Sequence, residues 1–109
     1  ELHHGGQRIG LEISASTLTG PSMGALLHLE NVPLGDRFAH DNEDVLWCDH
    51  LAVGFVAITL NRHYVRAEFL SVQTPRMAKG RVQSSGIFEA ENSGSRLSSW
   101  RHKHGRIIK

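Results

Sequence analysis

Eight histidines in a chain of 109 residues are the first side chains here that could do chemistry. His3 and His4 are adjacent, so on a strand they would point to opposite faces. His102 and His104 lie in a basic C-terminal stretch. None of the four has a cysteine or carboxylate partner at a spacing typical of a zinc or two-metal site. The sequence therefore predicts no metal ligands in this chain, although a histidine-rich metal-binding protein using these four residues stays open as an alternative.

Two histidines have an adjacent carboxylate, in the pairs His40-Asp41 and Asp49-His50. A neighbouring carboxylate can orient an imidazole or join it on a metal. Adjacent side chains on a strand diverge, however, so we expect both histidines to be surface or loop residues. His63, in an expected turn, is interpreted in the same way.

Nucleophile motifs are also missing from the sequence. There is no Gly-x-Ser-x-Gly elbow and no Gly-rich phosphate loop ending in Lys-Ser or Lys-Thr. Cys48 is the single cysteine, and its neighbours Leu46 and Trp47 favour a buried structural thiol over a reactive one. We predict no catalytic residue in this chain.

A hydroxyl-rich run between residues 14 and 19 is the one candidate for a binding surface. Ser16, Thr17 and Thr19 are predicted to lie next to a pocket, where their hydroxyls could contact an anion. The simpler alternative is a strand end whose hydroxyls are satisfied by nearby backbone.

These residues must be positioned by elements that the apolar pattern predicts. Ile9, Leu11, Ile13 and Ala15 alternate with small or polar residues, which predicts a strand over 9–15 that runs into a polar loop over 16–22. Residues 23–44 are expected to be mostly loop, with a short helix at 25–30. Regular structure is expected again at 45–48.

The clearest prediction is a β-hairpin, with arms over 54–60 and 64–70 and a turn at 61–63. Its second arm places Val65, Ala67 and Phe69 on one face and polar side chains on the other, which should meet water. The first arm is apolar on both faces and so needs cover on both sides. A weaker strand is predicted over 82–90.

The chain offers little to cover that first arm, because it has no long amphipathic helix and few other strands. We therefore expect it to be part of a larger domain, a view that its first residue, Glu1, also favours. Residues 1–92 would belong to that domain, and 93–109 would form a polar, basic, poorly ordered tail. In isolation, exposed apolar strands are expected to self-associate.

Composition excludes some partners. The formal net charge is +1, which gives no general field to attract nucleic acid. No apolar run approaches the roughly 18 residues that a membrane span needs. Neither a nucleic-acid partner nor a membrane span is predicted.

The order of segments resembles the C-terminal part of PhoD-like (alkaline phosphatase D) metallophosphoesterases over roughly residues 2–90. The matching segments are the strand and Ser/Thr run at 10–20, Gly54-Phe55-Val56, and Val65-Arg66-Ala67-Glu68-Phe69. The sequence departs from the family at Asn42-Glu43-Asp44, where Asn-Pro-His is usual. It also has Phe69 where Trp or Tyr is common.

This resemblance implies an α+β fold, in which a mainly β fragment completes one sheet of a calcineurin-like αββα sandwich. It implies that the parent enzyme hydrolyses phosphoesters with an iron and a calcium ion, and that it is bacterial and exported to the periplasm or beyond. The family's metal-ligand motifs lie upstream of Glu1, so the isolated chain is expected to be inactive. The alternative that the residues leave open is a self-contained, small β-rich binding or interaction module.

Overall fold

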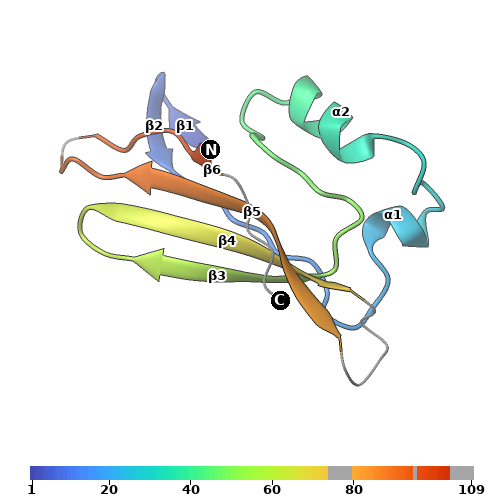
Figure 1. Ribbon diagram of the computed structural model, residues 1–109. Helices are drawn as coiled ribbons and strands as arrows, with labels where there is room; N and C mark the ends of the chain where they lie inside the picture. The colour runs from blue at the N-terminus through green and yellow to red at the C-terminus, as the bar shows by residue number, and fades with distance from the viewer. Residues whose placement is uncertain (74–79, 95, 104–109) are drawn as a thin grey trace.

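The computed structural model describes residues 1–73, 80–94 and 96–103. They form two antiparallel sheets and two short helices (Figure 1). The mainly β composition that the sequence predicts is confirmed. In chain order the elements are β1 (Leu2–His4), β2 (Gln7–Gly10), α1 (Met23–Leu26), α2 (Leu34–Asp41), β3 (Gly54–Leu60), β4 (Tyr64–Gln73), β5 (Arg81–Glu91) and β6 (Arg101–Lys103).

The larger sheet has the strand order β3-β4-β5-β6. Its first two strands are the predicted hairpin, with Leu60 paired to Val65 at the turn and Gly54 paired to Ser71 at the far end. The Asn61 side chain holds the turn, since its carbonyl oxygen accepts hydrogen bonds from the backbone N–H groups of His63 and Tyr64 at 2.8 and 3.0 Å. The hairpin prediction is confirmed, and the strand expected over 82–90 is found as β5.

The C-terminal segment contains a strand where a poorly ordered tail was expected. Arg101–Lys103 form β6, which pairs with β5 and places His102 beside Phe88. The prediction is wrong for these three residues because β5 presents a free edge to which they can hydrogen-bond. Residues 104–109, including His104, lie outside the described part of the chain.

The smaller sheet corrects the strand expected over 9–15. Only Gly10 and the three residues before it form a strand, β2, and its partner β1 was not predicted. The turn between them uses Gly5 and Gly6 at φ of 55° and 77°, a backbone conformation that glycine adopts readily. Residues 11–17 have the alternating pattern of a strand but no regular secondary structure, because no strand of a sheet pairs with them.

Residues 23–44 are more helical than the sequence suggests. The helix expected at 25–30 is α1, which begins two residues earlier because the Ser22 hydroxyl accepts a hydrogen bond from the Ala25 N–H at 3.2 Å. It ends just before His28, whose φ is +55°. α2 lies where a loop was expected. The regular structure expected at 45–48 is absent, and those residues cross one face of the larger sheet instead.

Part of the core lies on that face, where β4 and β5 meet, whereas Ile87, which is 4% exposed, is buried on the opposite face beside Glu68. Pairing puts Ala67 opposite Phe88 and Val65 opposite Ala90, so these four side chains share one side of the sheet. Ala67 and Ala90 are fully buried and Phe88 is 6% exposed. The other side is less open to water than expected, since the Glu68 residue is only 9% exposed.

Edge strand β3 continues the same apolar face but lacks cover. Ile58 and Leu60 are 57% and 75% exposed, and Phe55 on the opposite side is 39% exposed. The cover on both sides that its sequence calls for is therefore not supplied by the described residues. Neither α1 nor α2 is long and apolar enough to cross a membrane, and the described residues contain no other α-helix.

Candidate functional site

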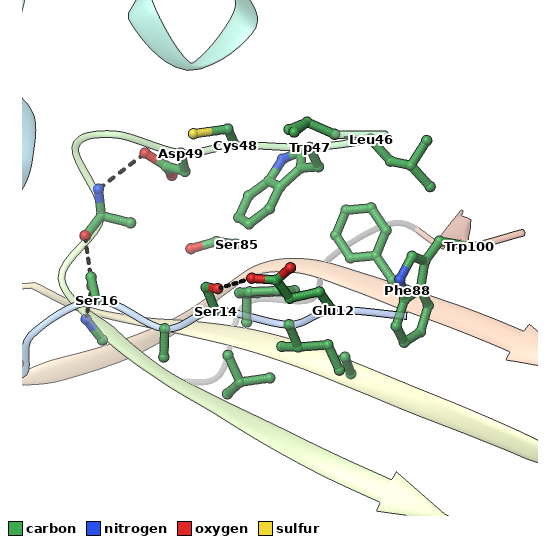
Figure 2. A pocket seen from close by; sticks show the side chains of 18 of the residues that line it. Glu12, Ser14, Ser16, Leu46, Trp47, Cys48, Asp49, Ser85, Phe88 and Trp100 are labelled. Carbon is green, nitrogen blue, oxygen red and sulfur yellow. Dashed lines mark hydrogen bonds between the residues drawn. The ribbon is translucent and has the colours of Figure 1, made fainter. Parts of the chain in front are cut away.

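A groove of about 610 Å³ lies between the apolar face of the larger sheet and two segments that cross it (Figure 2). Its floor includes Val56, Phe69 and Phe88. Residues 12–16 form one wall, and residues 44–50 pass above the floor as a roof. The groove is thus made by three parts of the chain that are distant in sequence.

Trp47 packs the roof segment, residues 44–50, against the aromatic side chains of the floor. Its ring centroid lies 4.7 Å from that of Phe69 and 5.4 Å from that of Phe88, and the two phenylalanine rings meet edge to face at 5.7 Å. Tilted and edge-to-face contacts of this kind stabilise beyond their buried area. His102 of β6 stacks on Phe88 at 4.7 Å and extends the aromatic cluster. The contacts of Trp47 with Phe69 and Phe88, rather than pairing in a strand, hold residues 45–48 against the sheet.

His50 anchors the far end of the roof to the helical segment. Its Nδ1 accepts a hydrogen bond from the Gly35 N–H at 3.2 Å, and its Nε2 donates to the Leu29 carbonyl at 3.2 Å. The Gly24 N–H also donates to the His50 carbonyl at 2.9 Å. Both ring nitrogens are engaged, so His50 has a structural role in this geometry.

Asp49 does not orient His50, although the two are adjacent. Its carboxylate accepts hydrogen bonds from the N–H groups of Leu51 and Ala52, both at 3.0 Å, and so closes a turn. In the second pair, His40-Asp41, the carboxylate does contact the imidazole: His40 Nδ1 lies 3.0 Å from Asp41, and both side chains are exposed. Neither pair contributes to a metal site.

Of the three residues predicted beside a pocket, Ser16 lines the groove, whereas Thr17 and Thr19 do not. The Ser16 hydroxyl donates to the Ala52 carbonyl at 3.0 Å and accepts from the Gly54 N–H at 3.3 Å. The Thr17 hydroxyl accepts from the Gly20 N–H at 3.1 Å. The hydroxyls of Ser16 and Thr17 therefore form hydrogen bonds with backbone groups, which is the alternative to an anion pocket that the sequence left open.

Four carboxylates line the groove, those of Glu1, Glu12, Asp44 and Asp49. No motif in the sequence groups these residues. Burial by itself would raise the pKa of Glu1, but hydrogen bonds from Ser99 and Arg8 and the Arg8 charge outweigh it and lower that pKa. The Arg8 guanidinium lies 3.1 Å from the Glu1 carboxylate.

Two of these carboxylates differ in their partners. Asp44 meets His3 at 2.8 Å. Glu12 has one partner within the described chain, the Ser14 hydroxyl, at 3.4 Å. Glu12 is exposed, and Figure 2 shows its carboxylate pointing into the groove below Trp47. Glu12 is therefore the lining carboxylate with the most unused bonding capacity.

Cys48 also lines the groove. Burial, and to a lesser degree the Asp49 carboxylate, raise the pKa of its thiol. The thiol is therefore mainly protonated at neutral pH, and a protonated thiol is a poor nucleophile. Cys48 is half-buried, where the sequence predicts a buried structural thiol.

The histidines do not assemble into a metal centre in the described part of the chain. No group of three His, Cys, Asp or Glu side chains there is placed to hold a metal ion. His3 contacts carboxylates on one side of the molecule, and His102 stacks on Phe88.

Comparison with known proteins adds no relative. No protein-family model, no curated protein and no solved structure matches this chain.

The groove has aromatic and aliphatic walls, and the pKa of its one thiol is raised. Asp49, Ser16 and His50 bond to backbone, whereas Glu1, Glu12 and Asp44 meet other side chains. The residues that build the groove, Trp47, Phe69, Phe88 and Glu12, were not singled out as site residues from the sequence. A usable signal was present, because both tryptophans of the chain, Trp47 and Trp100, line this groove.

Proposed function

We propose that this chain is the C-terminal part of a PhoD-like metallophosphoesterase and completes one sheet of that enzyme's αββα sandwich. The parent enzyme would hydrolyse phosphoesters, and this part would contribute architecture rather than chemistry. The proposal rests on the sequence resemblance and on one structural observation, the uncovered apolar surface of β3.

That observation has a clear energetic meaning. Ile58 and Leu60 are more than half exposed, yet they continue the apolar face that is buried around Phe88. Full burial of one such side chain stabilises a protein by roughly 1.5–3 kcal/mol. An edge strand with this pattern is well suited to contact with a further layer of protein, which the rest of a sandwich would supply.

The segments that carry the resemblance are neighbours in the hairpin. The two best-matching segments, Gly54-Phe55-Val56 and Val65-Arg66-Ala67-Glu68-Phe69, lie on adjacent strands, with Val56 directly opposite Phe69. Segments that a family keeps together in sequence are thus also neighbours in this sheet. This supports reading them as one structural unit.

The iron and calcium ions of the family do not fit the described residues of this chain. The described residues offer no set of three ligands, and both ring nitrogens of His50 are engaged by backbone. In the proposed parent, metals that activate a hydroxide and hold phosphoryl oxygens would be bound by residues upstream of Glu1.

The test is to extend the reading frame upstream of Glu1 and express the longer chain beside the 109-residue chain. We expect the longer chain to hydrolyse p-nitrophenyl phosphate when iron and calcium are supplied, and the shorter chain to be inactive. Hydrolysis by the 109-residue chain would contradict the proposal. So would an upstream frame that lacks Asp- and His-rich ligand segments.

One observation favours a second function, that of a small β-rich binding module. The groove is built entirely from this chain and is held by the Trp47 cluster and the His50 anchor. A module of this kind must fold alone. A cooperative thermal transition of the 109-residue chain, followed by circular dichroism, would favour the module, and its absence would favour a part of a larger domain.

A further inference from the structure

We infer that the groove binds a hydrophobic organic cation, such as an aryl-substituted ammonium ion, with the Glu12 carboxylate as its counter-charge. This inference concerns the groove alone and does not depend on the phosphoesterase proposal. It rests on the charge, shape and aromatic walls of the groove.

The charged side chains that line the groove have one sign, and the ammonium group of Glu1 is engaged by the Asp44 carbonyl oxygen. Among the described residues that line the groove there are four carboxylates and no lysine or arginine. Three of these carboxylates already have strong partners, which are Arg8 for Glu1, His3 for Asp44 and two backbone N–H groups for Asp49. Glu12 remains, because its partner in the described chain is a single hydroxyl at 3.4 Å. A cation is the ligand charge that this arrangement favours.

The walls suit the same ligand. Figure 2 shows Trp47 above Glu12, with Phe88 and Trp100 beside it. The face of an indole ring carries partial negative charge and attracts an ammonium group that approaches it. Phe88, which is 6% exposed and stacked on His102, supports the indole rings rather than offering a face of its own. A carboxylate next to such rings is a combination that recognises alkylated ammonium ions better than either part alone.

The rest of the groove accommodates an apolar body. Its volume of about 610 Å³ lies within the range of small-molecule sites. Ile13 and Val56 supply apolar surface beyond the aromatic cluster. A small inorganic cation would leave this surface unused, whereas an ammonium ion with an aryl or alkyl substituent would bury it.

An anionic ligand is disfavoured by the same residues. A phosphate group in the groove would face four carboxylates and find no cationic side chain among the described lining residues. The groove is therefore distinct from any phosphoester-binding site of the proposed parent. Ser16, the residue of the predicted anion pocket that does line it, uses its hydroxyl on backbone groups.

Tryptophan fluorescence can report binding in the groove. Trp47 and Trp100 are its only tryptophans, and both line the groove. We would titrate the 109-residue chain with benzyltrimethylammonium and follow tryptophan emission excited at about 295 nm, where indole dominates the signal. N-acetyltryptophanamide titrated in parallel corrects for collisional quenching. The inference predicts a saturating change with the cation, and a much weaker response to benzyl alcohol and benzenesulfonate.

Two variants locate the site. Glu12→Gln removes the counter-charge and is expected to weaken benzyltrimethylammonium binding by about three- to fivefold, as suits one charge contact at a partly exposed site. Glu43→Gln is the matched control, because Glu43 is an exposed acidic residue that does not line the groove. It should bind as the unaltered chain does.

Three outcomes would overturn the inference. The first is a response that does not saturate after the quenching correction. The second is equal affinity for the cation, the alcohol and the sulfonate, which would mark the groove as merely apolar. The third is an equal effect of Glu12→Gln and Glu43→Gln, which would place the contact elsewhere. Glu12 is exposed, so its substitution should leave the far-ultraviolet circular dichroism spectrum unchanged.

Discussion

The apolar face of the larger sheet has two halves that share one chemistry and differ in cover. The roofed half contains Val56, Phe69 and Phe88 and lies under Trp47. The bare half contains Ile58 and Leu60, near the hairpin turn. Phe88 is 6% exposed, whereas Leu60 is 75% exposed.

The difference separates two steps in folding. Strand alternation decides which face is apolar, and it does so equally in both halves. Burial then requires a second segment to reach that face, and residues 44–50 reach only the half nearest their anchor at His50. An apolar face is thus a local property of the sequence, while a core is a long-range one.

The largest expected contrast is between alanine substitutions in the two halves. Phe88→Ala should lower the free energy of unfolding by about 3–5 kcal/mol, as is usual for a buried phenylalanine. Leu60→Ala should change it by less than about 0.5 kcal/mol, because the side chain is already mostly in water. Urea unfolding of both variants measures the contrast. Similar losses at the two positions would mean that the halves are equally packed.

A second prediction compares the bare half in two contexts and rests on the phosphoesterase proposal. In the chain extended upstream of Glu1, Leu60→Lys should lower the free energy of unfolding by about 2–3 kcal/mol, because a charge would replace a covered apolar group. In the 109-residue chain the same change should be nearly neutral.

His63→Lys, in the exposed hairpin turn, is the control for the added charge in both chains. The thermal midpoint of each variant provides the measurement. A neutral effect of Leu60→Lys in the extended chain would show that nothing covers the bare half, and would remove the observation that carries the proposal.

The anchor of the roof can be tested at Gly35. A β-carbon there would lie 2.2 Å from the Cys48 carbonyl oxygen, so Gly35→Ala must push the roof away from α2. We expect a net loss of about 1–2 kcal/mol in the free energy of unfolding, even though alanine favours a helix over glycine by roughly 0.5–1 kcal/mol.

Gly10→Ala is the matched control, since its β-carbon would meet only side-chain atoms of Leu2, the nearest at 3.3 Å. Trp47 emission in both variants reports whether the roof has moved. A stabilised Gly35→Ala variant with unchanged emission would mean that residues 44–50 do not depend on this contact.

The smallest expected effect concerns Cys48, a residue of the roof. Because burial raises the pKa of its thiol, labelling by 5,5′-dithiobis(2-nitrobenzoate) at about pH 8 should be roughly tenfold slower in the folded chain than in urea. The folded rate should rise as the pH passes above the ordinary thiol range. The folded state holds this proton to higher pH than the unfolded state does, so the thiol also lowers stability on the alkaline side. Equal rates in buffer and in urea would contradict burial of the Cys48 thiol.

The sequence predicted the elements that are determined locally. The hairpin follows from an apolar first arm and an alternating second arm on either side of Asn61, a residue suited to turns, and β5 follows from a weaker pattern. The strand expected over 9–15 was mostly wrong, because Ile13 and its neighbours alternate like strand residues but line the groove without a pairing strand. Alternation of apolar and polar residues indicates an extended, half-buried segment. It does not show whether that segment pairs with a strand of a sheet or lines a groove without a pairing strand.

The groove could not be predicted, because its contacts join residues far apart in the chain. The Trp47 contacts with Phe69 and Phe88, and the His50 contacts with Leu29 and Gly35, depend on how the 44–50 segment returns across the sheet. α2 was missed although Leu34 and Phe38 have helical spacing, because Pro33 and Gly35 suggested a turn.

The two edges of the larger sheet set a limit on assembly. β3 has seven residues with neither charge nor proline, whereas β6 has three residues and is the basic run Arg101-His102-Lys103. Two chains that joined β3 to β3 antiparallel would set Ala57 against its own copy and Val56 against Ile58, with no like charges opposed. Such a pair consumes both β3 edges and leaves β6, an edge strand of only three residues, on the other side of each sheet. Sheet extension would therefore stop at two chains instead of growing into a fibre.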